Sequence, residues 1–154
     1  MLALFAVLLP FMEVSAGPSF LLQPGRPGIG HGPEVRMTAG LPLGDRFAGE
    51  LWASGVLETA PLRAPGDRAL LGGGVGGRML VRASSDAKLT LWARGGVGWS
   101  AVAGQGQPGP SGFAGGLISY QPFVKRFQLG VELDALAFRN TFGLAVLPSL
   151  RCEF

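Results

Sequence analysis

The sequence has few of the residues that soluble domains use for solvation or for covalent cross-links. It contains one cysteine, one histidine and 15% charged residues in 154 positions. A single cysteine, Cys152, cannot form an intramolecular disulfide, so the fold does not depend on a disulfide scaffold. The scarcity of charge is unusual for a domain whose whole surface meets water.

Long hydrophobic runs and basic clusters are scarce as well. The apolar run near the start, residues 2–12, is shorter than the roughly 20 residues that a helix needs to cross a bilayer. The formal net charge is +3, but the basic residues are scattered singly and form no Lys/Arg-rich stripe. Nucleic acid is therefore not an expected partner.

The start of the chain has the features of a secretory signal. The small residues Val14-Ser15-Ala16 follow the apolar run and are typical of a signal-peptidase site. The sequence thus predicts a signal peptide over residues 1–16 and a mature domain over 17–154. No Lys or Arg precedes the apolar run, which is unusual for such a signal, and the alternative is a buried first strand or helix.

Glycine and proline are abundant, with 26 and 12 residues, and between them apolar and polar residues alternate. The segment 141–154 is the clearest case, because every second residue from Phe142 to Phe154 is apolar or proline while Arg151 and Glu153 belong to the other series. Successive side chains of a strand point to opposite faces of a sheet. This segment therefore predicts a strand with one apolar and one polar face.

The same alternation recurs between turn signals and predicts an all-β chain. We expect eight strands at about residues 18–23, 33–42, 46–57, 69–83, 88–102, 112–123, 127–138 and 141–154. The connections LGD, SSDA and VKR are short, whereas GRPGIGHG, ETAPLRAPGDR and AGQGQPGPS are long. This asymmetry is typical of an up-and-down antiparallel transmembrane β-barrel with periplasmic turns and termini and outer loops. A soluble secreted barrel would instead place its apolar residues inside.

Aromatic residues of the apolar series are expected at the two membrane interfaces, where such barrels carry aromatic girdles. Four of them fall at the turn ends of their strands: Phe47, Tyr120, Phe127 and Phe154. Trp99 and Phe142 fall at the loop ends.

With its signal segment, alternating strands and terminal LRCEF, the chain resembles the small eight-stranded outer-membrane β-barrels of the OmpA and OmpX type. The resemblance implies an outer-membrane location and contact with outer-membrane lipid and lipopolysaccharide. It also implies insertion by the barrel-assembly machinery, for which the series ending in Phe154 is similar to the insertion signal of that family.

Charged residues of the polar series are expected inside the barrel, where an eight-stranded wall leaves room for side chains alone. Unpaired buried charges are costly, so these residues predict a paired network that plugs the lumen. A narrow gated channel along the same charges is the alternative. The series contains Glu34, Arg36, Glu50, Arg78, Arg82, Arg94, Glu132, Asp134, Arg151 and Glu153.

Catalytic and cofactor motifs are weak. Gly72, Gly74 and Gly77 match G-x-G-x-x-G, but the residues that follow predict strand, turn and strand instead of the helix that the motif requires. His31 is expected in the first long loop, without an H-x-S or G-x-S-x-G motif. We therefore expect no catalytic activity, no cofactor and no metal site. After the closed barrel and the narrow channel, a lipid-modifying outer-membrane enzyme is the third possible function. Cys152 is expected to be a small apolar residue on the lipid face.

Four arginines fall in the expected outer loops: Arg26, Arg63, Arg68 and Arg139. They are either solvated or bound to the phosphates of lipopolysaccharide by charge-assisted hydrogen bonds. The function that the sequence favours is a structural or interaction role at the cell envelope through these loops, with lipid or other envelope proteins as partners.

Overall fold

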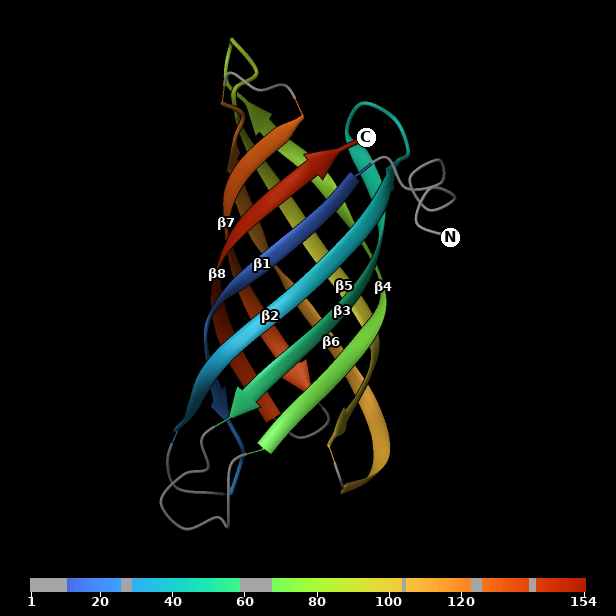
Figure 1. The fold of residues 1–154 in the computed structure, drawn as a ribbon, viewed down its shortest axis with the longest axis vertical. Helices are drawn as coiled ribbons and strands as arrows, with labels where there is room; N and C mark the ends of the chain where they lie inside the picture. Colours follow the sequence, from blue (N-terminus) through green and yellow to red (C-terminus); the bar gives the residue numbers. More distant parts are fainter. Residues whose placement is uncertain (1–10, 26–28, 59–67, 104, 123–125, 139–140) are drawn as a thin grey trace.

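A computed structural model describes residues 11–25, 29–58, 68–103, 105–122, 126–138 and 141–154. They form one sheet that closes on itself as a barrel (Figure 1). Each strand pairs antiparallel with the next and β1 pairs with β8, which confirms the predicted all-β, up-and-down barrel of eight strands. The described residues contain no helix that is long and apolar enough to cross a bilayer. The strands are β1 Phe11–Leu22, β2 Ile29–Pro42, β3 Phe47–Glu58, β4 Arg68–Ala83, β5 Leu89–Val102, β6 Gln105–Tyr120, β7 Phe127–Phe138 and β8 Thr141–Glu153.

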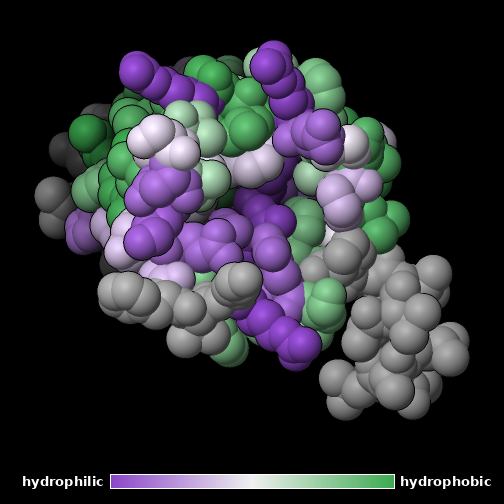
Figure 2. Space-filling model, turned by 90° about the horizontal axis from the view of Figure 1, so that it is seen from above, coloured by the Kyte–Doolittle hydropathy of each residue, from purple (hydrophilic) through white to green (hydrophobic). Residues whose placement is uncertain are grey.

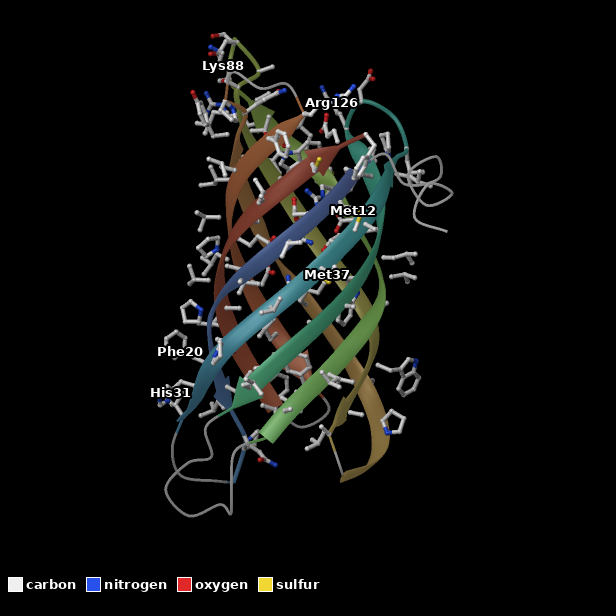
Figure 3. The ribbon with its side chains drawn as sticks, viewed as in Figure 1. Met12, Phe20, His31, Met37, Lys88 and Arg126 are labelled. Carbon is white, nitrogen blue, oxygen red and sulfur yellow. The ribbon has the colours of Figure 1, made fainter. Side chains whose placement is uncertain are left out.

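The two faces of the sheet follow the alternation of the sequence. In β7, for example, Leu129, Val131 and Leu133 are 50–60% exposed, whereas Glu132 and Asp134 between and beside them are fully buried. Apolar side chains thus cover the outer wall, where Met12 and Met37 project from β1 and β2 (Figure 3). This distribution is the reverse of that of a soluble barrel and matches a wall that faces lipid.

The start of β1 and the end of β8 lie at the same end of the barrel (Figure 1). We call this the turn end, because the connections 43–46, 84–88 and 121–126 also lie there. In the turn 84–88, the Ser84 hydroxyl (2.6 Å) and the backbone N–H of Lys88 (3.2 Å) donate to Oδ1 of Asp86. These hydrogen bonds, that of Ser84 first, hold the pKa of Asp86 below its usual value.

The opposite end, which we call the loop end, differs from the sequence-based expectation. The connection 103–104 is only two residues long, whereas the sequence predicts the long loop AGQGQPGPS at this place. The short connection 139–140 agrees with the predicted strands 127–138 and 141–154. The predicted loop AGQGQPGPS is wrong for the most part, because β6 already begins at Gln105 and extends the hairpin with β5. Glycine and proline in this segment are compatible with strand pairing, since Trp99 pairs with Pro110 and Ser100 with Gly109.

Strand β1 begins at Phe11, seven residues before the expected start at residue 18. Residues 11–16 of the predicted signal peptide therefore pair with β2, and residues 11–15 also pair with β8. Residues 1–10 lie outside the described part of the chain, and the signal peptide stays a prediction. A leader that ends before Phe11 is compatible with this β1, whereas cleavage after Ala16 would remove half of the strand.

Inward-facing glycines make room for large side chains in the narrow interior. A Cβ added to Gly96 would lie 2.6 Å from the Trp52 indole nitrogen and 2.7 Å from the Phe113 ring. Trp52 and Phe113 pack edge to face in this space, with ring centroids 5.5 Å apart. The same device recurs at Gly40, whose added Cβ would lie 2.4 Å from the Phe11 ring.

Candidate functional site

The interior of the barrel holds a network of buried ion pairs. On β2, the Arg36 guanidinium donates through Nη2 to Oε1 of Glu34 (2.8 Å). Its Nη1 donates to Oε2 of Glu132 (3.2 Å) and to Oδ2 of Asp134, both on β7. The face of the guanidinium lies 4.1 Å from the centre of the Phe113 ring on β6, a cation–π contact. Arg36 thus connects three carboxylates from two strands.

Arg94 on β5 joins this group to a second one. Its Nη1 lies 2.6 Å from Oε1 of Glu132 and 3.1 Å from Oε1 of Glu13 on β1. Its Nη2 donates to Oε2 of Glu50 on β3 at 3.2 Å. Arg78 on β4 then binds Glu13 with both Nη atoms at 3.0 Å and donates through Nε to Glu50. The ion pairs form one connected network across β1, β2, β3, β4, β5 and β7.

The charged side chains of this network are buried. Glu34, Glu132 and Asp134 have exposed fractions of 0%. Among the residues that the structure describes, the buried groups comprise three guanidinium groups and five carboxylates: Arg36, Arg78, Arg94, Glu13, Glu34, Glu50, Glu132 and Asp134. Carboxylates are thus in excess, and within the described part Oε2 of Glu34 and Oδ1 of Asp134 have no hydrogen-bond partner.

Toward the loop end, the network is followed by a layer of buried apolar side chains. Leu21 and Val56 are 1% exposed, and Leu136 is 3% exposed. The layer comprises Leu21, Trp52, Val56, Phe113, Leu136, Phe138, Ala145 and Leu147, with Leu70 packed against it. Ions would have to pass this layer to reach the charges from the loop end.

Toward the turn end, the interior is more open. Arg151 pairs with Glu153 at 3.0 Å, with side chains 13% and 38% exposed, and Gln128 donates to the same carboxylate. The Phe11 ring lies beneath the guanidinium groups of Arg151 (4.0 Å) and Arg78. Viewed from this end, hydrophilic side chains occupy the middle of the molecule and hydrophobic ones lie around them (Figure 2).

The structure places nine of the ten predicted lumen residues on the inner face. The exception is Arg82, which is exposed. The pairing of β4 with β5 shifts between Leu80 and Arg82, which puts Arg82 opposite the outward-facing Leu91. Such a bulge reverses the alternation and moves the side chain to the other face.

Glu13 is the network residue that the sequence-based prediction missed, because it lies in the segment assigned to the signal peptide. The signal that identifies it is the alternation of Phe11, Glu13 and Ser15 with Met12 and Val14. In the structure, Phe11, Glu13 and Ser15 are buried, and Ser15 donates a hydrogen bond to Glu132.

The six predicted interface aromatics all lie on the surface of the barrel, with exposed fractions between 41% and 63%. Phe47, Tyr120, Phe127 and Phe154 lie at the turn end, at or next to the ends of their strands. Trp99 and Phe142 lie near the loop end, where Phe142 pairs with Leu22. Phe20 also projects outward near the loop end, beside His31 (Figure 3).

The remaining candidates have different positions. His31 belongs to β2 and not to a loop, and its side chain is on the outer wall. Gly72, Gly74 and Gly77 lie within β4, which a turn connects to β5. Cys152 is half-buried on β8, opposite Met12 and Phe127. The predicted loop residues Arg26, Arg63 and Arg139, and the side chain of Arg68, lie outside the described part of the structure.

A closed up-and-down barrel with an apolar outer wall and charged residues inside has the fold of the small outer-membrane barrels. Solved structures share this fold over nearly the whole chain. Neisserial surface protein A matches with a TM-score of 0.69 and 16% identity, covering 94% of this chain and 96% of that one. The sequence matches no protein-family model and no curated protein.

Two further structures support the same fold. The outer-membrane protein OprG from Pseudomonas aeruginosa matches with a TM-score of 0.61 and 9% identity, covering 95% of this chain and 96% of that one. Ail, the attachment invasion locus protein of Yersinia pestis, matches with a TM-score of 0.57 and 12% identity, covering 92% and 96%. The structural match establishes a common fold. At such low identities it does not establish a common activity, which has to be argued from the residues of this chain.

Proposed function

We propose that the protein is an integral outer-membrane β-barrel whose lumen is closed by ion pairs, with a structural or interaction role at the cell envelope. The observation that carries the proposal is the opposite character of the two faces of the wall. Apolar side chains such as Leu133, 60% exposed, cover the outside, while the charged network inside is inaccessible to water. An exposed apolar band of this extent is stable in lipid and aggregates in water.

The closed lumen is supported by the continuity of the packing. A paired network spans six strands, and the apolar layer with Trp52 and Phe113 lies between it and the loop end. Eight-stranded walls are just wide enough for side chains to fill them. A non-catalytic protein without an open pore fits these features best.

An interaction role is supported by the fold neighbours. Ail of Yersinia pestis has been crystallised in complex with the heparin analogue sucrose octasulfate. In this chain, Arg26, Arg63, Arg68 and Arg139 are the residues that we propose for contacts with anionic groups such as the phosphates of lipopolysaccharide. Barrel-assembly machinery and other envelope proteins are the further partners of this proposal, and the termini would then be periplasmic.

The membrane location can be tested with a pair of substitutions at exposed leucines. Leu133 lies in the middle of β7, and Leu43, 70% exposed, lies in the turn 43–46. Leu133→Arg should cost about 2–4 kcal/mol because it places a guanidinium in the hydrocarbon region, and Leu43→Arg should cost little. The readout is the amount of heat-modifiable protein in the outer-membrane fraction. Recovery of the protein as a soluble monomer, with both variants equally tolerated, would overturn the proposal.

A further inference from the structure

The carboxylates around Arg36 outnumber the cations that neutralise them. The Arg36 guanidinium pairs with Glu34 at 2.8 Å, with Glu132 at 3.2 Å and with Asp134. Glu132 has a second ion pair, with Arg94 at 2.6 Å, whereas Glu34 and Asp134 have Arg36 alone as ion-pair partner within the described residues. We call Arg36 and its three carboxylates the Arg36 cluster.

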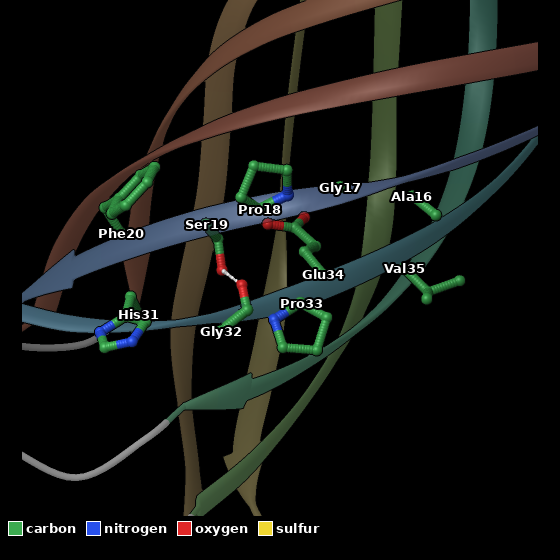
Figure 4. A pocket seen from close by; sticks show the side chains of 10 residues that line it. All are labelled: Ala16, Gly17, Pro18, Ser19, Phe20, His31, Gly32, Pro33, Glu34 and Val35. Carbon is green, nitrogen blue, oxygen red and sulfur yellow. Dashed lines mark hydrogen bonds between the residues drawn. The ribbon is translucent and has the colours of Figure 1, made fainter.

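Two oxygens of the Arg36 cluster have no hydrogen-bond partner in the described part of the chain: Oε2 of Glu34 and Oδ1 of Asp134. Both side chains have exposed fractions of 0%. Glu34 lies beside Gly17 of β1, in the wall of the groove drawn in Figure 4. Oδ1 of Asp134 fills the space that a side chain at Gly115 on β6 would occupy. An ionised oxygen that is buried without a donor is costly, and a neutral carboxyl group costs much less.

The other charges of the lumen do not remove this excess. Strand β6, which closes the wall beside the cluster, has no charged residue. Together with the Arg36 cluster, the described residues of the lumen supply four guanidinium groups against six carboxylates. The groups outside the cluster are Glu13 on β1, Glu50 on β3, Arg78 on β4, Arg94 on β5, and Arg151 and Glu153 on β8.

We propose that the Arg36 cluster binds at least one proton when the barrel is folded at neutral pH, so that the closed lumen is more stable in mildly acidic than in alkaline solution. A buried charge without a counter-ion is neutralised by proton uptake. A metal ion is a poorer occupant, because the described residues contain no group of three or more ligands that could hold one. The proposal rests on the proposed function, since water in an open lumen would stabilise the ionised carboxylates.

Proton uptake on folding determines the direction of the pH dependence. The carboxyl groups of an unfolded chain ionise near about pH 4, whereas the folded cluster keeps its proton to a higher pH. The unfolded chain then binds fewer protons at neutral pH, and stability falls as the pH rises. One proton changes the unfolding equilibrium constant by up to about ten-fold per pH unit. Carboxylates that are fully compensated by cations act in the opposite direction, because they lose stability as the pH falls.

Urea unfolding of the barrel in lipid vesicles at pH 6 and pH 8 tests this direction. The unfolding constant of the wild-type protein should be at least about five-fold higher at pH 8. Glu34→Gln removes one negative charge from the cluster, whichever carboxylate carries the proton, and should reduce this ratio to less than about two-fold. Asp45→Asn removes the same charge from the exposed turn 43–46 and should keep the wild-type ratio. Equal ratios for the two variants would overturn the proposal.

Infrared spectroscopy of the wild-type barrel tests the proton without any substitution. A protonated carboxyl group has a C=O stretching band that ionised carboxylates lack, and a detergent without ester groups leaves this region clear. The band should be present at pH 7 in the folded barrel and absent in the Glu34→Gln variant. Its absence from a heat-modifiable, non-conducting wild-type barrel would overturn the bound proton. Steady conductance of the wild-type barrel would instead contradict the closed lumen of the proposed function.

Discussion

The side chains that distinguish this barrel at the residue level are its buried charges. Arg36 holds Glu34, Glu132 and Asp134, and each of these carboxylates has an exposed fraction of 0%. Desolvation of a charge costs several kcal/mol, and a buried pair offsets this cost only when its geometry and hydrogen bonds are good. The contribution of each charged residue to stability therefore depends on how many buried partners would lose their ion pair if that residue were replaced.

We predict opposite outcomes for two neighbouring substitutions in this network. Arg36→Met should lower the free energy of unfolding by about 3–5 kcal/mol, because Glu34 and Asp134 lose their cation and Glu132 keeps only its ion pair with Arg94. Glu34→Gln should change it by about 1 kcal/mol or less, because the amide oxygen still accepts from Arg36 and the excess of carboxylates decreases. Urea unfolding in lipid vesicles, followed by tryptophan fluorescence, measures both values.

Equal losses for these two variants would show that the network does not depend on Arg36 as its connecting cation. The exposed Arg82 provides a matched control on another strand. Arg82→Met should change the free energy of unfolding by less than about 1 kcal/mol, because the guanidinium is not in the lumen.

Alternation along the strands predicted most of these positions, and its failures have local causes. The inward positions of Glu132 and Asp134 follow from the period of two in β7. Arg82 was misplaced because a bulge after Leu80 shifts the register, and a period carries no information about an inserted residue. Glu13 was missed because its segment was assigned to a signal peptide.

At the level of the strands, the seam between β1 and β8 differs from the other seams. Its pairing runs from Phe11 to Ser15 and resumes at Ser19, so Ala16–Pro18 and Val146–Pro148 lie between the paired stretches. Pro18 and Pro148 have no backbone N–H to donate. The strands nevertheless stay close, because a Cβ on Gly17 would lie 2.1 Å from the carbonyl oxygen of Val146.

Backbone amide exchange should therefore be faster at this seam than in β7, which pairs without interruption with β8 and β6 from Leu129 to Phe138. Hydrogen–deuterium exchange of the barrel in nanodiscs, resolved by peptide, measures the difference. Pro148→Val restores a donor and should slow exchange in the segment around Gly17. Equal protection of the seam and of β7 would contradict this account.

Two tryptophans can show which face of the wall contacts lipid. Trp99 on β5 is 63% exposed on the outer wall, and Trp52 on β3 is 5% exposed in the lumen. Brominated lipids should quench the fluorescence of Trp99 much more than that of Trp52, because only the first ring contacts acyl chains. Variants that retain one tryptophan each, with the others changed to Phe, separate the two signals, and equal quenching would contradict the orientation.

The sequence predicted all eight strands correctly, but it predicted the positions of their ends less accurately. The bounds of β7 agree with the prediction, whereas β6 starts at Gln105 instead of residue 112. Glycine and proline in QGQPGPS indicate a loop by local propensity, but pairing of this segment with β5 and the closure of the barrel extend the strand. Local sequence signals do not indicate which distant segment a strand will pair with, so they could not predict this extension.

For the molecule as a whole, the fold is shared with proteins of very different sequence. Neisserial surface protein A has the same barrel at 16% identity. A membrane barrel requires an apolar outer face, a closed ladder of hydrogen bonds and an interior without isolated charges. Many sequences meet these conditions. Proteins with this fold can therefore differ in the side chains that occupy the lumen and in their loops.

The state of the lumen decides the function, because a closed interior separates a structural or interaction protein from a channel. The charged side chains of the network are buried, and the apolar layer around Phe113 and Leu136 lies next to them. The ladder of an eight-stranded wall cannot widen without losing hydrogen bonds that lipid does not replace.

Conductance of the purified, heat-modifiable barrel in planar bilayers tests whether the lumen is closed. We expect no steady conductance, because the ion pairs of Arg36, Arg78 and Arg94 across the lumen should leave no continuous path for ions. Stable, voltage-responsive conductance would contradict it, and a change of ion selectivity when Glu132 and Asp134 are both replaced by Ala would show that these charges line a pathway.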